Sequence, residues 1–266
     1  MNTLKILFFG DIVGRRGRLA VAEKMPEYQK KHKPDIVIAN AENLAHGFGI
    51  TTKAIEEMQE AGIDFFTSGN HIWKKKEGLS LLLEPNNAVI RPHNYPPMNP
   101  GLGYKILNIG DYKILVINLL GRVFMKEMTD CPFRGIDEIL KKVENEPLHA
   151  IFVDFHAEAT SEKSAFFHYV DGRVSAAVGT HTHVATADAR VTETGTALIT
   201  DVGMCGAKDS VIGHKKLQII QRFLTQIDTT HEVEEEGGGV ISAVLITIDP
   251  RTKKAIAIKS WMDEVL

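Results

Sequence analysis

The sequence predicts an α/β protein, specifically a four-layer αββα sandwich of two mixed β-sheets flanked by helices. Three observations predict this fold class. The chain begins with a βαβαβ pattern joined by short connections, a β-hairpin and further βα units follow, and two antiparallel strands close it. A (β/α)8 barrel fits less well, because eight regular βα units cannot be counted. Since no repeat and no linker divides the chain, we expect one domain over residues 1–266.

The first half of the chain supplies the βαβαβ pattern. Continuous apolar runs indicate strands that are buried on both faces, whereas mixed polar and apolar spacing indicates helices. A basic turn before Pro34 ends the first helix, and Gly62 ends the second. The predicted elements are strands at 4–10, 35–39 and 64–67 and helices at 18–31, 51–61 and 74–83.

The second half supplies the hairpin and the remaining units. Five of the ten prolines stand at positions 85, 92, 96, 97 and 100, so residues 85–100 are predicted to form an irregular surface loop. Gly110-Asp111 is the predicted hairpin turn. The further predicted elements are strands at 104–109, 113–120, 149–154, 174–178 and 197–200, helices at 162–170 and 215–226, a solvated acidic loop at 234–239, and closing antiparallel strands at 240–248 and 254–261.

Composition limits the class of protein. With 266 residues and 44% hydrophobic residues, the chain can bury a substantial core. The formal net charge of −3 disfavours strong nucleic-acid binding and binding to an anionic membrane. Cys131 and Cys205 stand in no CxxC spacing, so a reducing compartment is expected. No run approaches the roughly 18 apolar residues of a membrane span. We therefore expect a soluble cytoplasmic protein with no membrane partner, and a homo-oligomer stays open.

Polar side chains follow five of the predicted strands, at the point where each strand ends. The motifs are Gly10-Asp11, Ala41-Glu42-Asn43, Gly69-Asn70-His71, Asp154-Phe155-His156 and Gly179-Thr180-His181-Thr182-His183. Each alone has an ordinary explanation, such as a helix N-cap or a turn. Their repetition at strand ends makes coincidence a poor explanation. On an extended segment, His181 and His183 would face the same side and reach a shared site.

Seven side chains in these motifs are typical ligands of a metal centre: Asp11, Glu42, Asn43, Asn70, His156, His181 and His183. Three imidazoles, two carboxylates and two amide oxygens suit Mn²⁺, Fe²⁺ or Zn²⁺, and differ from a thiolate-rich structural zinc site. Their number exceeds what one ion needs, so two ions are expected. Two divalent ions, the carboxylates of Asp11 and Glu42, and one hydroxide together leave one positive charge. Such a site favours an anionic substrate and predicts phosphoester hydrolysis.

The order of these motifs resembles the calcineurin-like metallophosphoesterase superfamily. The variants GDIVG, AENLAHG, TSGNHIW, DFHAEATSEK and GTHTHV are more similar to its YmdB-like branch of bacterial phosphodiesterases. The resemblance runs from Asp11 to His183 and includes TDVGM at 200–204. It implies the αββα metallophosphoesterase fold and a dinuclear iron or manganese centre. It also implies that metal-activated hydroxide hydrolyses 2′,3′-cyclic nucleotides or related phosphodiesters, which are the expected small-molecule partners.

The resemblance also implies a role for each site residue. Glu42 would bridge the two ions, Asp11, Asn43 and His183 would complete one site, Asn70, His156 and His181 would complete the other, and His71 would give a proton to the leaving oxygen. The chain departs from the superfamily pattern in three places. Val13 replaces a histidine, Glu42 replaces an aspartate, and Ile72 replaces the acidic residue after Gly-Asn-His. The last change leaves nothing adjacent in sequence to orient His71, and its protonation state stays open.

Two other function classes stay open. A dinuclear amidase-type hydrolase usually carries His-x-His on its first strand, where this chain has Asp11. A catalytically weak regulatory protein that binds nucleotide through its metals would not need His71. Among lesser candidates, His46 could approach the substrate, Arg15 and Arg16 could assist a phosphate, and no partner makes Cys205 a nucleophile. The remaining six histidines, at positions 32, 93, 149, 168, 214 and 231, are expected to be structural or exposed.

Overall fold

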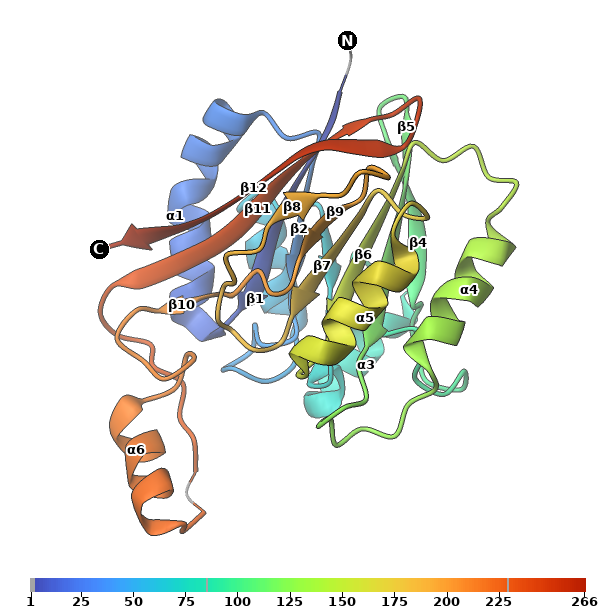
Figure 1. Ribbon diagram of the computed structural model, residues 1–266. Coiled ribbons are helices and arrows are strands. Elements are labelled where there is room, and N and C mark those ends of the chain that lie inside the picture. The colour runs from blue at the N-terminus through green and yellow to red at the C-terminus, as the bar shows by residue number, and fades with distance from the viewer. Residues whose placement is uncertain (1–2, 85, 229) are drawn as a thin grey trace.

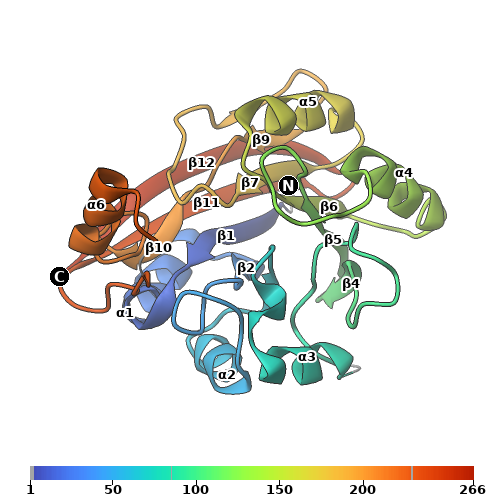
Figure 2. The same ribbon diagram turned by 90° about the horizontal axis from the view of Figure 1, so that it is seen from below.

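A computed structural model describes residues 3–84, 86–228 and 230–266 of the chain, so the predicted loop position Pro85 lies outside the described residues. Two six-stranded mixed sheets pack face to face, and helices cover their outer faces (Figure 1). The predicted αββα sandwich is therefore confirmed. The view in Figure 2 separates the helices α1, α2 and α3 beside one sheet from α4 and α5 beside the other.

The first sheet has the strand order β12-β11-β10-β1-β2-β3. Strand β1 runs parallel to β2 and β10, and antiparallel to β11. The strands are β1 Leu4–Ile12, β2 Ile36–Asn40, β3 Phe65–Thr67, β10 Met204–Ala207, β11 Gly239–Asp249 and β12 Lys254–Val265, and the helices on this side are α1 Gly14–His32, α2 Thr52–Glu60, the 3-10 helix η1 Ile72–Lys74 and α3 Lys76–Leu83.

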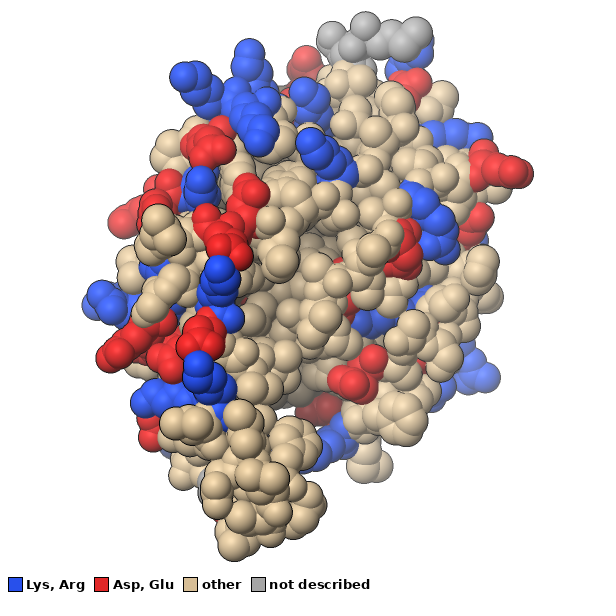
Figure 3. All heavy atoms as spheres, turned by 60° about the vertical axis from the view of Figure 1, so that its left-hand side comes forward, with Lys and Arg blue, Asp and Glu red and all other residues tan. Residues whose placement is uncertain are grey.

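The second sheet has the order β4-β5-β6-β7-β9-β8, with β5, β6, β7 and β9 parallel and the two edge strands antiparallel. Its strands are β4 Tyr104–Ile109, β5 Tyr112–Leu120, β6 Ala150–His156, β7 Ala176–Thr180, β8 Arg190–Val191 and β9 Ala197–Ile199, and its helices are α4 Pro132–Lys142 and α5 Thr160–Val170. Helix α6 Lys216–Thr225 projects from the body, and the face drawn in Figure 3 shows it free of charged side chains at its outer end.

The core explains why the central strands are continuously apolar. Leu4, Ile6 and Phe8 of β1 point between the two sheets, whereas Leu7 and Phe9 point toward the helices of the first sheet. The ring centroids of Phe8 and Phe152 lie 5.1 Å apart and join the two sheets. Each such side chain contributes about 1.5–3 kcal/mol when it is fully buried. Strands buried on both faces therefore form a rigid base for the loops that follow them.

The sequence interpretation missed four elements: the 3-10 helix η1, helix α4 and strands β8 and β10. Helix α4 begins with Pro132 at its first turn and packs Ile136 and Ile139 into the core. It was not predicted, because polar residues separate its few apolar positions in the sequence. Strands β8 and β10 are two and four residues long, too short for a periodic signal. Helix α1 also begins earlier than predicted, at Gly14, whose backbone N–H donates to the carbonyl of Asn43.

The proline-rich loop agrees with its expected irregularity but not with its expected surface position. Residues 86–100 form no regular element, but Val89, Ile90 and Tyr95 are buried, because the backbone of Phe66 bonds Ala88 and Ile90 and so attaches this loop to the edge of β3. The closing antiparallel pair is present as β11 and β12. Within the described residues, no helix combines the length and apolar character needed to cross a bilayer.

Candidate metal centre

The strand-end residues of both sheets meet at one edge of the sandwich. Asp11 lies near the end of β1, Glu42 and Asn43 follow β2, and Asn70 follows β3. From the facing sheet, His156 ends β6, and His181 and His183 follow β7. Carboxyl ends of parallel strands meet at the same edge of a sheet, which explains how residues so distant in sequence converge.

One group of donor atoms contains Asp11, Glu42 and His183, whose nearest carboxylate and imidazole atoms lie within 4.8 Å of one another. The distance from His183 Nε2 to Asp11 Oδ1 is 4.0 Å. Asn43 Nδ2 lies 3.0 Å from Glu42 Oε1 and 3.1 Å from His183 Nε2. The amide of Asn43 therefore presents its nitrogen, not its oxygen, to this group.

A second group contains Glu42, His156 and His181, again within 4.8 Å. His156 Nε2 lies 3.2 Å from Glu42 Oε2 and 3.0 Å from His181 Nδ1. Asn70 Oδ1 is 3.2 Å from the same His156 nitrogen. Glu42 thus belongs to both groups, with Oε2 beside His156 and Oε1 beside Asn43.

The two histidines of the Gly-x-His-x-His motif do not share a side, so the expectation of an extended segment is wrong. His181 has φ 99° and His183 has φ 65°, positive backbone angles that residues other than glycine rarely adopt. The chain turns sharply after β7, and this turn sends the His181 ring to His156 and the His183 ring to Asp11. The two rings therefore join different groups of donors.

The backbone leaves no spare room around the donors. The N–H of His181 donates to Asp11 Oδ2 at 3.0 Å, and the N–H of His71 donates to Glu42 Oε2 at 3.0 Å. A Cβ atom on Gly69 would lie 2.2 Å from Glu42 Oε2 and 2.3 Å from His156 Nε2. Only glycine fits at position 69, because any side chain there would displace both donors.

Charge and burial fit this centre to metal cations. Asp11 and Glu42 are 0% and 1% exposed, and Asp11 Oδ1 makes no hydrogen bond with any residue that the structure describes. Burial raises the pKa of Asp11. Burial also disfavours the charge of Glu42, but His156 and His71 together outweigh burial and hold the Glu42 pKa well below its usual range. A buried carboxylate oxygen without a partner is costly, and a bound cation removes that cost.

His71 lies beside the two groups without completing either. Its Nδ1 is 3.0 Å from Asn43 Oδ1 and 3.1 Å from Glu42 Oε1, and the Phe48 ring packs edge-on at 4.9 Å. Among the described residues none bonds its Nε2. Residues from the loop after β2 therefore orient this ring, which answers the question raised by the missing acidic neighbour at Ile72.

Comparison with known proteins gives the same family as the strand-end motifs. A family model described as a YmdB-like protein matches residues 7–261. The chain belongs to this family. It is 45% identical over 256 residues to a Bacillus subtilis (strain 168) protein named 2′,3′-cyclic-nucleotide 2′-phosphodiesterase, with 96% of each chain covered. The resemblance seen in the strand-end motifs is therefore confirmed.

Solved structures give the same result for the fold of this YmdB-like chain. A structure described as a novel phosphatase from Mycoplasma pneumoniae superposes with a TM-score of 0.93 at 37% identity, covering 100% of this chain and 95% of that one. A putative 5′-nucleotidase from Staphylococcus aureus superposes with a TM-score of 0.62 at 13% identity, covering 99% of this chain and 54% of that one. The second likeness supports the metallophosphoesterase fold alone.

Behind the histidines of this YmdB-like site lies a buried polar network that the sequence interpretation did not assign. Asp154 Oδ1 accepts from Thr180 Oγ1 at 2.6 Å, and Thr180 Oγ1 lies 2.9 Å from His156 Nδ1. Asp154 Oδ2 accepts from Asn40 and Thr67. Burial raises the pKa of Asp154 to about 6. Asp154 belongs to the Asp154-Phe155-His156 motif, but nothing in the sequence indicated that its side chain supports His156.

A buried ion pair supports the loop that carries the other two histidines. Lys163 Nζ lies 2.6 Å from Asp201 Oδ2, and both side chains are 1% exposed. The same Asp201 carboxylate accepts the backbone N–H groups of Thr182 and Gly203. This ion pair thus joins two segments that carry the family resemblance, SEK at 161–163 and TDVGM at 200–204, beneath the site.

The lesser candidates differ in their surroundings. Arg16 is buried and donates to the carbonyls of Val265 and Leu266, so it ties the C-terminal strand. His46 has an 83% exposed side chain and lies 3.6 Å from Glu235. Cys205 is fully buried, and burial raises the pKa of its thiol to about 12, which makes it a poor nucleophile. His214, expected to be structural, packs against Phe48 at 5.7 Å.

Proposed function

We propose that this chain is a dinuclear metal-dependent phosphodiesterase that hydrolyses 2′,3′-cyclic nucleotides or related phosphodiesters. The observation that carries the proposal is the position of Glu42, which belongs to both groups of donors, with Oε2 beside His156 and Oε1 beside Asn43. The name of the Bacillus subtilis relative supports this substrate class. Family membership disfavours the amidase-type alternative.

In this proposal each group of donors would hold one ion. Asp11, Asn43 and His183 would hold the first, Asn70, His156 and His181 would hold the second, and Glu42 would contribute to both. Hard oxygens and imidazoles suit iron or manganese, and zinc also fits this donor set. When bound, such ions would supply the positive charge that polarises a phosphoryl group and activates water as a nucleophile.

The chain's own residues orient the substrate and move the proton. A half-turn of the Asn43 amide would bring its oxygen among the donors. In its imidazolium form, His71 donates from Nδ1 to Glu42 Oε1, which keeps the ring in place, and carries its second hydrogen on Nε2, the nitrogen that no described residue bonds. From Nε2 it would donate that proton to the departing ribose oxygen and become a neutral ring.

Metal quantitation combined with a hydrolysis panel tests the proposal. Freshly purified protein, dialysed mildly, is expected to retain about two metal equivalents per chain, because seven donors overfill one coordination sphere. The panel contains 2′,3′-cyclic nucleotides, 3′,5′-cyclic nucleotides and linear phosphodiesters. A reproducible value of one equivalent, with no gain on adding Mn²⁺ or Fe²⁺, contradicts the dinuclear centre. Two equivalents without turnover on any ester favour the regulatory alternative.

A further inference from the structure

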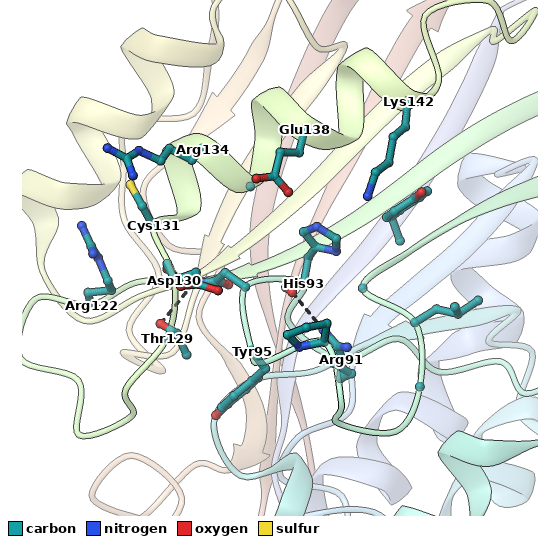
Figure 4. A pocket seen from close by; sticks show the side chains of 17 residues that line it. Arg91, His93, Tyr95, Arg122, Thr129, Asp130, Cys131, Arg134, Glu138 and Lys142 are labelled. Carbon is teal, nitrogen blue, oxygen red and sulfur yellow. Dashed lines mark hydrogen bonds between the residues drawn. The ribbon is translucent and has the colours of Figure 1, made fainter.

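A cavity of about 680 Å³ lies beside the metal centre, between helix α4 and the loop that follows residue 90 (Figure 4). Leu120 pairs with the donor His156 in neighbouring strands, and Arg122, two residues further on, lines the cavity. Strand spacing and chain geometry therefore put the Arg122 backbone within about 12 Å of the His156 backbone. Tyr95, also in the lining, packs on Trp73, which follows His71 by two residues.

The lining is rich in positive charge. Its four cations are Arg91, Arg122, Arg134 and Lys142, and its two acidic residues are Asp130 and Glu138. In the described part of the chain, none of these four cations lies within 4.0 Å of a carboxylate oxygen. A chain with net charge −3 thus gathers unpaired cations around one cavity. Such a surface favours an anionic ligand.

Arg91 gives the strongest indication of a ligand, because it is buried without a counterion. Its side chain is 5% exposed, and its guanidinium donates to the carbonyls of Pro92, His93 and Asn99. Its Nε makes no hydrogen bond with any described residue. Neutral carbonyls orient the group but do not balance its charge. A buried charge without compensation is costly, and an anion in the cavity supplies the compensation.

The start of helix α4 adds to this field. Cys131 at the N-cap makes no side-chain capping bond, and the first turn contains no acidic residue. Arg134 stands in that turn, and Cys131 also lines the cavity. The positive end of a helix dipole and its free N–H groups favour a phosphate or carboxylate. Glu138 and Lys142 extend from the next turns of α4 toward His93 (Figure 4).

We propose that this cavity binds a second phosphoryl group of the substrate whose phosphodiester lies at the metal centre. The inference rests on the proposed function and specifies its substrate class: a 2′,3′-cyclic nucleotide that carries a further phosphate on its 5′ side. One or two nucleotide units span the distance from His156 to Arg122. Arg134, Lys142 and Arg122 would contact the phosphate, and Arg91 would supply charge from beneath.

The test compares adenosine 2′,3′-cyclic phosphate with and without a 5′-phosphate. A charged hydrogen bond contributes about 1.5–3 kcal/mol, so wild type is expected to prefer the phosphorylated compound by about tenfold or more in kcat/KM. In the double variant R134Q/K142Q this preference is expected to fall toward one. Both residues are exposed, so folding is not at risk. The control K30Q/K31Q removes two exposed charges on α1 and is expected to keep the preference.

Hydrolysis of both compounds without preference, or a preference unchanged in R134Q/K142Q, overturns the inference. The cavity could be occupied by a free phosphate ion instead of a phosphate of the substrate. If inorganic phosphate changes hydrolysis of the unphosphorylated compound only when Arg134 and Lys142 are present, and no preference exists, the cavity binds an effector and the substrate assignment is wrong.

Failure of the proposed function is distinguishable. If neither compound is hydrolysed by metal-loaded protein, calorimetry with adenosine 5′-monophosphate still tests the cavity. Binding heat that is lost in R134Q/K142Q supports a phosphoryl site. Equal heat in wild type and in the double variant overturns it.

Discussion

The two sheets contribute different chemistry to the same centre. The first sheet supplies carboxylate and amide groups, here called the oxygen side, and the second supplies imidazoles, the imidazole side: Asp11, Glu42, Asn43 and Asn70 on one, and His156, His181 and His183 on the other. Neither sheet alone has a complete donor set. The site therefore exists only where the sandwich is closed, and bound ions would hold the two sheets together at this edge.

The two sides are also held in place differently. Backbone N–H groups fix the carboxylates of Asp11 and Glu42. Buried side chains fix the histidines, through Asp154 behind His156 and Asp201 beneath the 181–183 loop. Substitutions on the oxygen side should therefore change ion binding directly, whereas substitutions behind the histidines should act through ligand orientation.

Glu42→Gln should have the largest effect on metal content and activity, because it removes the negative charge of the one residue shared by both groups of donors. We expect metal content to fall at both sites and activity to approach background. Asn43→Ala, the matched change on the neighbouring residue, should weaken mainly one site. Metal quantitation of the two variants side by side measures the difference. Full loading and activity of Glu42→Gln would contradict the bridging role.

His71→Ala should separate proton transfer from ion binding. His71 bonds Asn43 and Glu42 but completes neither group, so metal content and substrate affinity should stay near wild type. Turnover should fall by about 10²–10⁴-fold, the usual contribution of a general acid. The loss should shrink for a nitrophenyl phosphodiester, whose leaving group scarcely needs a proton. Equal losses on both esters would indicate phosphate positioning, and loss of metal would make His71 a ligand.

Asp154→Asn should have a smaller effect, confined to the imidazole side. The amide cannot accept from Thr180, Asn40 and Thr67 together as the carboxylate does, so Thr180 loses its fixed position beside His156. Metal affinity or activity should fall about 10–100-fold. Titration with Mn²⁺ should show one weakened site and one normal site. The exposed Asp111→Asn is the control, and weakening of both sites equally would argue for general destabilisation.

The sequence predicted the sandwich because strands buried on both faces leave unambiguous apolar runs, as in β1 and β6. It also predicted which side chains meet, since all of them follow such strands. It did not predict how His181 and His183 point, because that depends on two left-handed residues with no glycine to signal them. Nor did it assign Asp154, Lys163 or Asp201, whose importance lies in buried pairing across elements distant in sequence.

Substitution of Cys205 should have the smallest effect on metal content and turnover. It tests whether a residue takes part in the site merely because it lies close to the oxygen side. Its strand β10 pairs with the end of β1, where Asp11 and Met204 are partners. Its thiol is nevertheless buried and bonded to the carbonyl of Ser242, and burial raises its pKa to about 12. Cys205→Ala should therefore leave metal content and turnover unchanged. In native protein, a thiol reagent should modify Cys131, which is partly exposed, and should reach Cys205 only after unfolding. Rapid modification of both thiols with loss of activity would mean that β10 opens in solution. The oxygen side would then be less rigid than its backbone bonds indicate.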